Sequence, residues 1–549
     1  MSQLAKVFAS FFKKKRLLAC LAALVSIGAR PWILLLLIGI VHRTVVFIRF
    51  REDILHVAAA HANDLALLQL YPLQVYRQHF WSGIWLLQQT PPLPHFIVKA
   101  ALAITTWPVG FTELLFGLQA GITIWTACVL NDLVARVTGS WVAGFFLALW
   151  FMLSTDLLIL ENTFYGQAFY ENLGMLLVAL CCSACLRGAA HDSRQAGLAG
   201  LCAALAALTR SSLSYFSFVP LLAALPRWRG RALVAYLAPV LLLQGGWALK
   251  NAAVYGHLTL ETSSWGGYSA AMGLAVDKQR QQLCDFIKAA PPGAYKDWFV
   301  ASLRDCPWPL ANYGEAGKPA KVQAQDAAAQ ARLGQIAFLN TRAASFTSAQ
   351  YRRAVLRYAV AYPGRFLLRL ADLYPLFWER IGNYGVMFAD PFVVDRPRQD
   401  FPGLLTRGFH EKQRIEMTTG PALGPPTVSR PAAFGTISLA PLDAVSIVCV
   451  HLLLPLLVLI DLWRRRRGLP GFLPAGTAIL GWTVAYGVVM FNIADAGENM
   501  RFRLAVEPEI IAVSAACLVV IGRGVKHFYL KKQQKLLTRL SRTGRRQPC

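Results

Sequence analysis

The chain contains ten apolar stretches, and positive charge falls on alternate connections between them. The stretches cover residues 31–50, 112–131, 141–159, 169–185, 195–209, 212–226, 232–249, 443–463, 470–492 and 504–522. Most have about the 17–25 residues that a helix needs to cross a bilayer, with 195–209 and 212–226 at the short end. This pattern predicts an all-α multi-pass membrane protein with about ten transmembrane helices.

The distribution of basic residues predicts the orientation. With the N-terminus in the cytoplasm, the basic clusters fall on cytoplasmic connections, as the positive-inside rule requires. These clusters are Arg136, Arg187 and Arg194, RWRGR at 227–231, RRRR at 464–467, and the tail from Arg523. The net charge of +26 therefore reflects topology and anionic headgroups. Nucleic-acid binding is disfavoured, because no basic patch lies on a domain that could hold a duplex.

This orientation divides the chain into five parts. They are a cytoplasmic or interfacial N-terminus (1–30), the first seven helices with an outer loop at 51–110 (31–249), an outer domain (250–442), the last three helices (443–522) and a basic cytoplasmic tail (523–549). The outer domain is long enough for its own core and is expected to be mostly helical, with juxtamembrane helices nearby. Within it, Pro363 predicts a break between two helices in the segment 349–385.

Two cysteines, Cys284 and Cys306, fall in the predicted outer domain. A disulfide between them is one interpretation for an oxidising compartment, and two unrelated buried thiols are the other. The remaining cysteines lie in or beside predicted helices or in the tail, where a thiol acts as a small apolar group. No CxxC pair or His/Cys cluster indicates a structural metal site.

Four cationic residues lie at the predicted outer ends of helices, where the positive-inside rule disfavours them. They are Arg210, Lys250, Arg501 and Arg503. Each one alone is explained by a side chain that reaches the headgroups from a helix end. Four on one face, three of them Arg, indicate a phosphate-binding site, because a forked guanidinium makes strong charge-assisted hydrogen bonds to that anion.

Carboxylates are expected on the same face. Asp64 lies in the first outer loop, Glu161 at the outer end of the third helix, and Glu171 ten residues further on. A carboxylate at the apolar boundary loses hydration, which raises its pKa towards the range of a general base. The alternative for Asp64 is that it only caps a juxtamembrane helix.

The order of short motifs carries a resemblance to a family. An outer loop with Asp64 and then PPL is followed by a TR turn, WALKNAAVYG, GGY and RFRLAVEP; these lie at 91–93, 209–210, 247–256, 266–268 and 501–508. In this order the chain resembles the GT-C superfamily of membrane glycosyltransferases, in particular the branch of protein mannosyltransferases and aminoarabinose transferases. The matches span the membrane portion, whereas most of the outer domain has no matching motif. Lys250 stands where that family more often has Arg, and Asn63–Asp64 stands where some members have two acids.

The resemblance implies transfer of a sugar from a polyprenyl-phosphate carrier to a lipid, glycan or protein acceptor outside the cytoplasm, with inversion. Asp64 would be the general base, and Glu161 would orient the acceptor or assist the base. The cations would stabilise the leaving phosphate. They are Arg210, Lys250, Arg501 and Arg503. Tyr165, Tyr268 and Glu171 would contact substrate, although tyrosines are also ordinary interfacial anchors.

Several further points stay open. A divalent cation, Mg²⁺ or Mn²⁺, could bridge Asp64, Glu161 and phosphate, but too few carboxylates converge to predict it. The Ala/Leu/Arg-rich composition favours a bacterial inner (plasma) membrane, with the endoplasmic reticulum as the alternative. A transporter or flippase of a lipid-linked or anionic solute is the other class of function. Such a protein would ordinarily place charges near the bilayer midplane, at broken helices.

Overall fold

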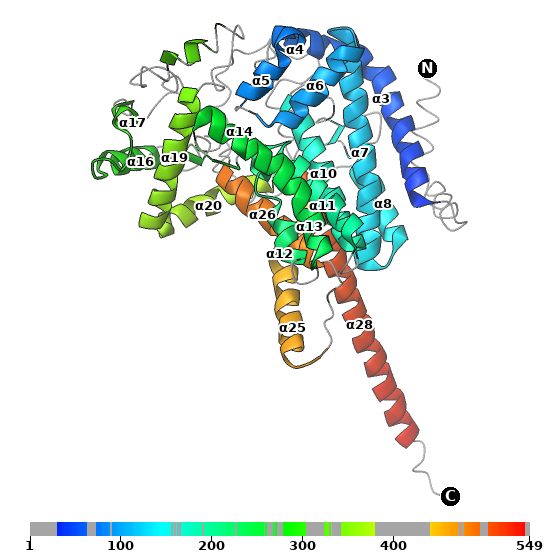
Figure 1. The fold of residues 1–549 in the computed structure, drawn as a ribbon. Helices are drawn as coiled ribbons and strands as arrows, with labels where there is room; N and C mark the ends of the chain where they lie inside the picture. Colours follow the sequence, from blue (N-terminus) through cyan, green and yellow to red (C-terminus); the bar gives the residue numbers. More distant parts are fainter. Residues whose placement is uncertain are drawn as a thin grey trace, which may run out of the picture.

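The computed structural model of the protein describes most of the chain outside the N-terminus, the region 379–439 and several short segments. The described residues are 30–62, 73–87, 90–154, 157–158, 161, 166–188, 192–224, 228–256, 258–260, 267, 270–271, 278–302, 323–324, 326–328, 331, 342–378, 440–469, 473, 477–494 and 503–543. Within these ranges the regular structure is helical and no strand occurs (Figure 1).

Six helical segments are long and apolar enough to cross a membrane. They belong to α3 (Pro31–Ala62), α7 (Val109–Thr138), α10 (Gly166–Arg187), the continuous run α13–η2–α14 (Arg231–Pro239, Val240–Gly245, Gly246–Tyr255), the run α24–η6–α25 (Ala440–Val448, Cys449–Leu453, Leu454–Arg466), and η7–α28 (Leu504–Val506, Glu507–Thr543). The prediction of an all-α membrane protein is therefore confirmed at this level.

The four other predicted stretches contain shorter helices, so a count of about ten spanning helices does not follow from the structure. They hold α8 (Trp141–Met152), α11 (Ser193–Ala207), η1 with α12 (Ser211–Leu213, Phe218–Ala224), and α26 (Thr477–Ala494). The 12 residues of α8 reach only about 18 Å, whereas the hydrocarbon core is about 30 Å thick. The predicted stretches thus overstate the helix length at α8 and α12, where turns interrupt the helices inside the bundle.

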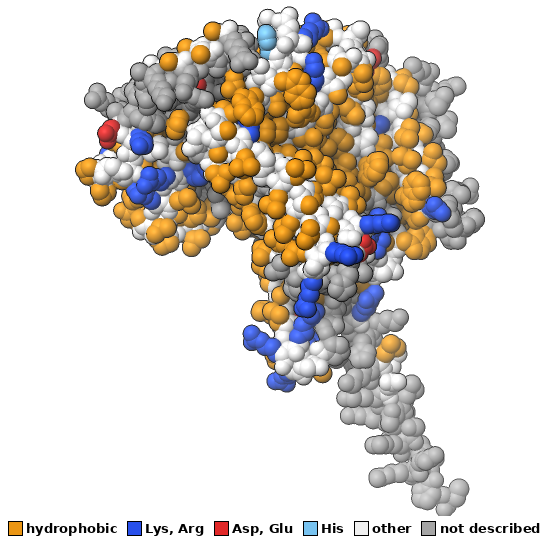
Figure 2. All heavy atoms as spheres, in the orientation of Figure 1, with side chains coloured by type: hydrophobic (Ala, Val, Ile, Leu, Met, Phe, Trp, Pro, Cys, Tyr) orange, Lys and Arg blue, Asp and Glu red, His pale blue; other side chains and the backbone are white. Residues whose placement is uncertain are grey.

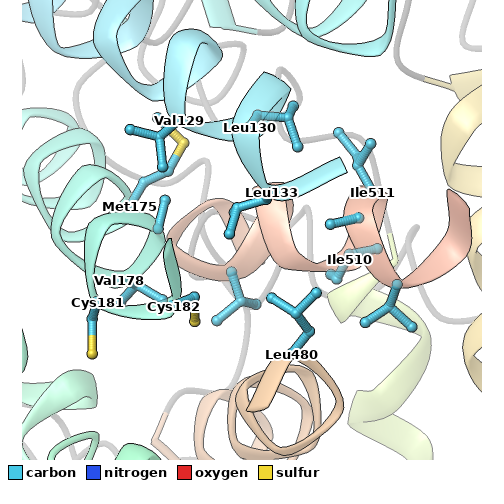
Figure 3. Close-up of a cluster of buried hydrophobic side chains, with 14 of the residues drawn as sticks. Val129, Leu130, Leu133, Met175, Val178, Cys181, Cys182, Leu480, Ile510 and Ile511 are labelled. Carbon is cyan, nitrogen blue, oxygen red and sulfur yellow. The ribbon is translucent and has the colours of Figure 1, made fainter. Parts of the chain in front are cut away.

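The core of the bundle forms where α7, α10, α26 and α28 meet. Figure 3 shows its side chains converging from these four helices: Val129, Leu130, Leu133, Met175, Val178, Cys181, Cys182, Leu480, Ile510 and Ile511. Small residues bring other helices close. A side chain at Gly144 would meet the carbonyl oxygen of Asn131 at 2.6 Å, and Gly200 lies directly against the backbone of Tyr236. Such close backbone approach is typical of helix packing in membranes.

The basic helix ends that the sequence places in the cytoplasm meet at one edge of the bundle. Asp132 of α7 contacts Arg136 at 2.9 Å and Arg187 of α10 at 3.0 Å. Close by, Arg523 of α28 donates to the carbonyl oxygen of Thr138 at 3.0 Å. The C-terminal ends of α7 and α10 and the middle of α28 therefore lie together, as the alternating charge pattern predicts.

The predicted first outer loop contains three short helices, α4 (Leu73–Gln78), α5 (Phe80–Leu86) and α6 (Pro92–Ile104). Their apolar side chains form one cluster with Phe111 of α7, Phe169 and Tyr170 of α10, and Trp247 of α14. The loop is thus packed onto the ends of α7, α10 and α14 opposite the basic edge.

The predicted outer domain has its own core. Helices α16 (Lys278–Lys288), α17 (Asp297–Ser302) and α19 (Arg342–Ala361) enclose Leu283, Phe299 and Tyr351. The predicted break at Pro363 is confirmed, since α20 (Pro363–Phe377) begins there. Cys284 is disulfide-bonded, and its partner lies outside the described residues.

Candidate functional site

Five of the nine predicted site residues lie in the part of the chain that the structure describes. They are Glu161, Glu171, Arg210, Lys250 and Arg503, and all five are buried. The other four lie outside the described residues: Asp64, Arg501, Tyr165 and Tyr268.

Arg210 and Glu171 form an ion pair, although the sequence assigned them separate roles. Arg210 lies on the turn between α11 and η1, and its Nη1 is 2.5 Å from an Oε1 of Glu171 on α10. Only 9% of the Arg210 side chain and 1% of the Glu171 side chain are exposed. The loop helix α6 covers this turn, because Leu93 donates its backbone N–H to the carbonyl of Leu208 at 3.0 Å. The pair is therefore a fixed charged unit between two helices and the outer loop.

Lys250 is held by acceptors and by an aromatic ring. Its Nζ donates to the backbone carbonyl of Leu87 at 2.6 Å and to the side-chain oxygen of Asn251 at 3.1 Å. The same Nζ lies 3.8 Å from the centre of the Trp247 ring, which is close enough for a cation–π interaction. The hydroxyl of Tyr255 donates to the neighbouring carbonyl of Leu86 at 2.5 Å, so both residues of α14 bind the C-terminal end of α5. These contacts place a cation where the outer loop meets α14.

Arg503 is the most deeply buried of the described cations. Its side chain is completely buried at the start of η7, with Nε 3.0 Å from Oε2 of Glu507 one turn later. Its Nη1 also approaches the carbonyl of Phe377 at 3.5 Å, and its guanidinium carbon lies 5.7 Å from the centre of the Trp378 ring. Arg503 thus joins the beginning of the last helix to the end of α20.

Glu161 is paired with a residue that the sequence analysis did not single out. Arg43 of α3 donates from Nε and Nη2 to the two carboxylate oxygens of Glu161, both at 2.7 Å. A third hydrogen bond runs from Arg43 to the carbonyl of Met152 at 2.8 Å. This hydrogen bond gives a partner to the backbone carbonyl of the last residue of α8. A single Arg inside the apolar run 31–48 was the available signal, because a charge at that depth needs a partner.

The paired groups lie at a similar height above the basic edge. Glu171 precedes Arg187 by 16 residues, and Glu507 precedes Arg523 by 16 residues, so each carboxylate is about 24 Å from the basic edge along its helix. Lys250 lies 19 residues after the start of α13, about 28 Å by the same measure. Helix α10 packs against both α11 and η7. The described cations therefore occupy one layer near the end of the bundle opposite the basic edge.

A buried polar chain links the outer loop to this layer. His95 of α6 makes hydrogen bonds with Tyr76 through Nδ1 at 2.7 Å and with Thr90 through Nε2 at 2.6 Å. The side chain of Tyr170 on α10 lies close to Thr90 and to the guanidinium of Arg210. Burial lowers the pKa of His95 from its ordinary 6.5 to about 3, so the ring is neutral. A neutral imidazole donates through one nitrogen and accepts through the other, which suits two hydroxyl partners.

Two further carboxylates at the start of α28 escaped the sequence analysis. Glu507 pairs with Arg503, as described above. Glu509 is fully buried inside the bundle, close to the thiol of Cys182 on α10. Both stand in the EPE triplet that follows the RFRL motif, and acidic residues just inside a predicted spanning stretch were the signal.

Metal binding finds no support in the described part of the chain, where no group of three or more His, Cys, Asp or Glu side chains is close enough to hold an ion. Asp64, one of the two carboxylates considered for a divalent cation, lies outside that part.

The described site therefore consists of buried cations, each held by an internal partner, beneath a packed outer loop. Comparison with known proteins adds no family to this geometry: no protein-family model matches the chain, and neither a curated protein nor a solved structure is significantly similar to it.

Proposed function

We propose that the protein is an integral membrane glycosyltransferase that moves a sugar from a polyprenyl-phosphate carrier to an acceptor on the non-cytoplasmic face. The observation that carries this proposal is the layer of buried cations opposite the basic edge, with Arg210 and Lys250 at its centre. A phosphate at the bilayer surface needs cations at this height, and helix ends on the outer side otherwise avoid them.

Arg210 and Lys250 are the best phosphate ligands among the described cations. The guanidinium of Arg210 carries five N–H donors in a planar fork, more than a single carboxylate contact uses, and its Nη1 is the nitrogen that contacts Glu171. Lys250 supplies a point charge held in place by Leu87 and Trp247. Both side chains keep a small exposed fraction, whereas Arg503 has none. Arg503 therefore fits a positioning role at the start of η7.

The general base in this proposal is Asp64. It lies two residues beyond the end of α3, where the outer loop begins. Glu161 is a poorer candidate, because Arg43 occupies both of its carboxylate oxygens. Glu161 instead fixes α3 against the end of α8, and in this way supports the segment that leads to Asp64.

The reaction is an in-line displacement. Asp64 takes the proton from an acceptor hydroxyl, the hydroxyl oxygen forms a bond to the anomeric carbon, and the bond from that carbon to the phosphate oxygen breaks. The polyprenyl phosphate leaves with the electron pair, and the configuration inverts. Arg210 and Lys250 lower the barrier by stabilising the charge that grows on the phosphate, which is worth on the order of 10²-fold in rate per contact. A bacterial inner membrane is the location that we favour.

The test compares Asp64→Asn with wild type in lipid nanodiscs. Radiolabelled polyprenyl-phosphate sugars are offered with an extract of envelope acceptors, and donor binding is measured in parallel. The proposal expects transfer to be lost while donor binding stays. Asp297→Asn is the matched control, because Asp297 is an exposed carboxylate of the outer domain. Full transfer by Asp64→Asn would remove Asp64 as the base.

A transporter or flippase is the second candidate, and Glu509 favours it. An ionisable side chain that is fully buried inside a membrane bundle is often a proton or substrate site in transporters. The two functions differ in products, because a flippase moves the intact carrier lipid across the bilayer. Movement of an intact polyprenyl-phosphate sugar in proteoliposomes, with no sugar released to an acceptor, would favour this second function.

A further inference from the structure

The corner between α19 and α20 has an exposed apolar surface that no described residue covers. Figure 1 shows the two helices meeting at the lower edge of the outer domain, and Figure 2 shows apolar side chains along that edge. On α20, Leu367 is 63% exposed and Leu368 is 67% exposed. On the last turns of α19, Leu356 is 61% exposed and Val360 is 83% exposed. This strip of Leu356, Val360, Leu367 and Leu368 is termed the corner surface.

Helix α20 has three different sides. Phe366 packs against the core of the outer domain, and Phe377 is fully buried in the bundle core, so this side faces protein. Leu367 and Leu368 lie on a second, exposed apolar side. Arg365 is exposed; at 100° per residue it lies about 160° around the helix from Leu367 and about 60° from Leu368, at the border of the apolar side. A helix with protein, apolar and charged sides is suited to the boundary between lipid and water.

The position of α20 relative to the spanning helices identifies the surface that it meets. Its C-terminal residues contact His451, with ring centres 5.3 Å apart for Tyr374 and 5.1 Å for Trp378. His451 lies six residues after Val445, where the spanning segment Val445–Arg466 begins, about 9 Å along the helix. This depth agrees with the roughly 5–10 Å to which interfacial helices bury their apolar side.

Charge at the corner is also complementary to lipid headgroups. Arg353 and Arg365 are exposed beside the apolar strip, and Arg357 is partly exposed. The guanidinium carbon of Arg365 lies 5.1 Å from the centre of the Tyr362 ring, at the corner itself. Arginines that flank an apolar strip, together with a tyrosine, are the side chains that favour the headgroup region.

We propose that the corner surface docks onto the non-cytoplasmic leaflet of the bilayer, with Leu367 and Leu368 in the acyl region and Arg365 at the phosphates. The docked helix ends on the candidate site, since Phe377 and Trp378 contact Arg503. The lipid surface thereby holds α20 over the start of η7. This inference is independent of the proposed transferase activity.

The test places an environment-sensitive fluorophore at single introduced cysteines, Leu367→Cys, Leu368→Cys and, as the matched control, Arg365→Cys. The full-length protein is reconstituted at one copy per nanodisc of phosphatidylethanolamine and phosphatidylglycerol, without polyprenyl lipid. Some of the lipids carry a spin-label quencher near the headgroup end of the acyl chain. Wild type treated with the same fluorophore gives the background from native cysteines.

Docking predicts that quenching at positions 367 and 368 is about twofold or more greater than at position 365. Equal, weak quenching at all three positions would overturn the proposal. Quenching that disappears when polyprenyl phosphate is added would assign the surface to the carrier tail instead. A fluorescence change that occurs only in nanodiscs with two copies would assign it to self-association.

Discussion

Arg43 and Glu161 form a bidentate ion pair in which both N–O distances are 2.7 Å. The two residues are 118 positions apart in the sequence. Both side chains are almost completely buried, at 3% and 0% exposure. The pair joins α3 to the segment that follows α8, at the point where α8 ends before it has crossed the membrane. A buried pair of this kind is costly to break, because either partner alone is an uncompensated charge.

Arg43→Ala is therefore expected to destabilise the protein by about 3–5 kcal/mol. The measurement is the thermal unfolding midpoint of the detergent-solubilised protein, followed by intrinsic fluorescence. Arg136→Ala is the control, because that arginine pairs with Asp132 at a partly exposed site and its loss should cost less than about 1 kcal/mol. Equal shifts for the two variants would contradict a structural role for the buried pair.

Arg210→Lys is expected to lower sugar transfer on the order of 10²-fold. Lysine keeps the charge but loses the planar group that can contact Glu171 and a phosphate together. Initial rates with polyprenyl-phosphate sugar in nanodiscs give the effect, and Arg194→Lys at the cytoplasmic edge serves as the control. Wild-type rates for Arg210→Lys would show that Arg210 only holds Glu171.

His95 predicts a pH dependence of stability. Its pKa is lowered from 6.5 to about 3 in the folded protein, so the unfolded chain binds more protons between these values. The free energy of unfolding should therefore be fully retained above pH 6.5. It should fall as the pH drops towards 3, by up to about 1.4 kcal/mol per unit from this residue.

His95→Gln keeps hydrogen-bonding groups but removes the titration, so it should flatten this slope. Ser140→Ala controls for a general loss of stability, because it removes the N-cap of α8, worth about 1 kcal/mol, without removing an ionisable group. Unfolding midpoints between pH 3 and 7 measure both variants. An unchanged slope in His95→Gln would show that protonation of His95 does not limit acid stability.

Cys284 tests which face of the membrane the outer domain occupies. A disulfide persists in an oxidising compartment, so Cys284 should resist alkylation in intact cells until a membrane-impermeant phosphine is added. Mass spectrometry of the alkylated peptide gives the result, with the free thiol of Cys128 as an internal reference for a cysteine in a spanning helix. Labelling of Cys284 without reductant would contradict the predicted orientation.

Much of this architecture could be predicted from apolar length and charge, because the bilayer imposes both. The basic edge around Asp132 and Arg187 and the helix break at Pro363 are examples. The early end of α8 at Met152 was missed, because the predicted apolar stretch ran on to residue 159 through Ser154, Thr155 and Asp156. These three polar residues were the available signal. Breaks of this kind depend on a distant partner, here Arg43, that satisfies the freed carbonyl.

The positions of the cations at helix ends could be predicted from the sequence, but their partners could not. Charge at the wrong end of a helix identifies Arg210, Lys250 and Arg503 one residue at a time. The pairing of Arg210 with Glu171 depends on how α10 and α11 pack, which periodicity does not specify. One acceptor of Lys250 is the backbone carbonyl of Leu87, and no residue type in the sequence indicates a partner of that kind.

The most direct test of the central proposal is the release of free polyprenyl phosphate by the wild-type protein. Radiolabelled polyprenyl-phosphate sugar is incubated with nanodisc-embedded protein and envelope acceptors, and both products are quantified. The account predicts one polyprenyl phosphate released for each sugar that appears on an acceptor. Binding of the donor without release of polyprenyl phosphate, for any sugar offered, would contradict it.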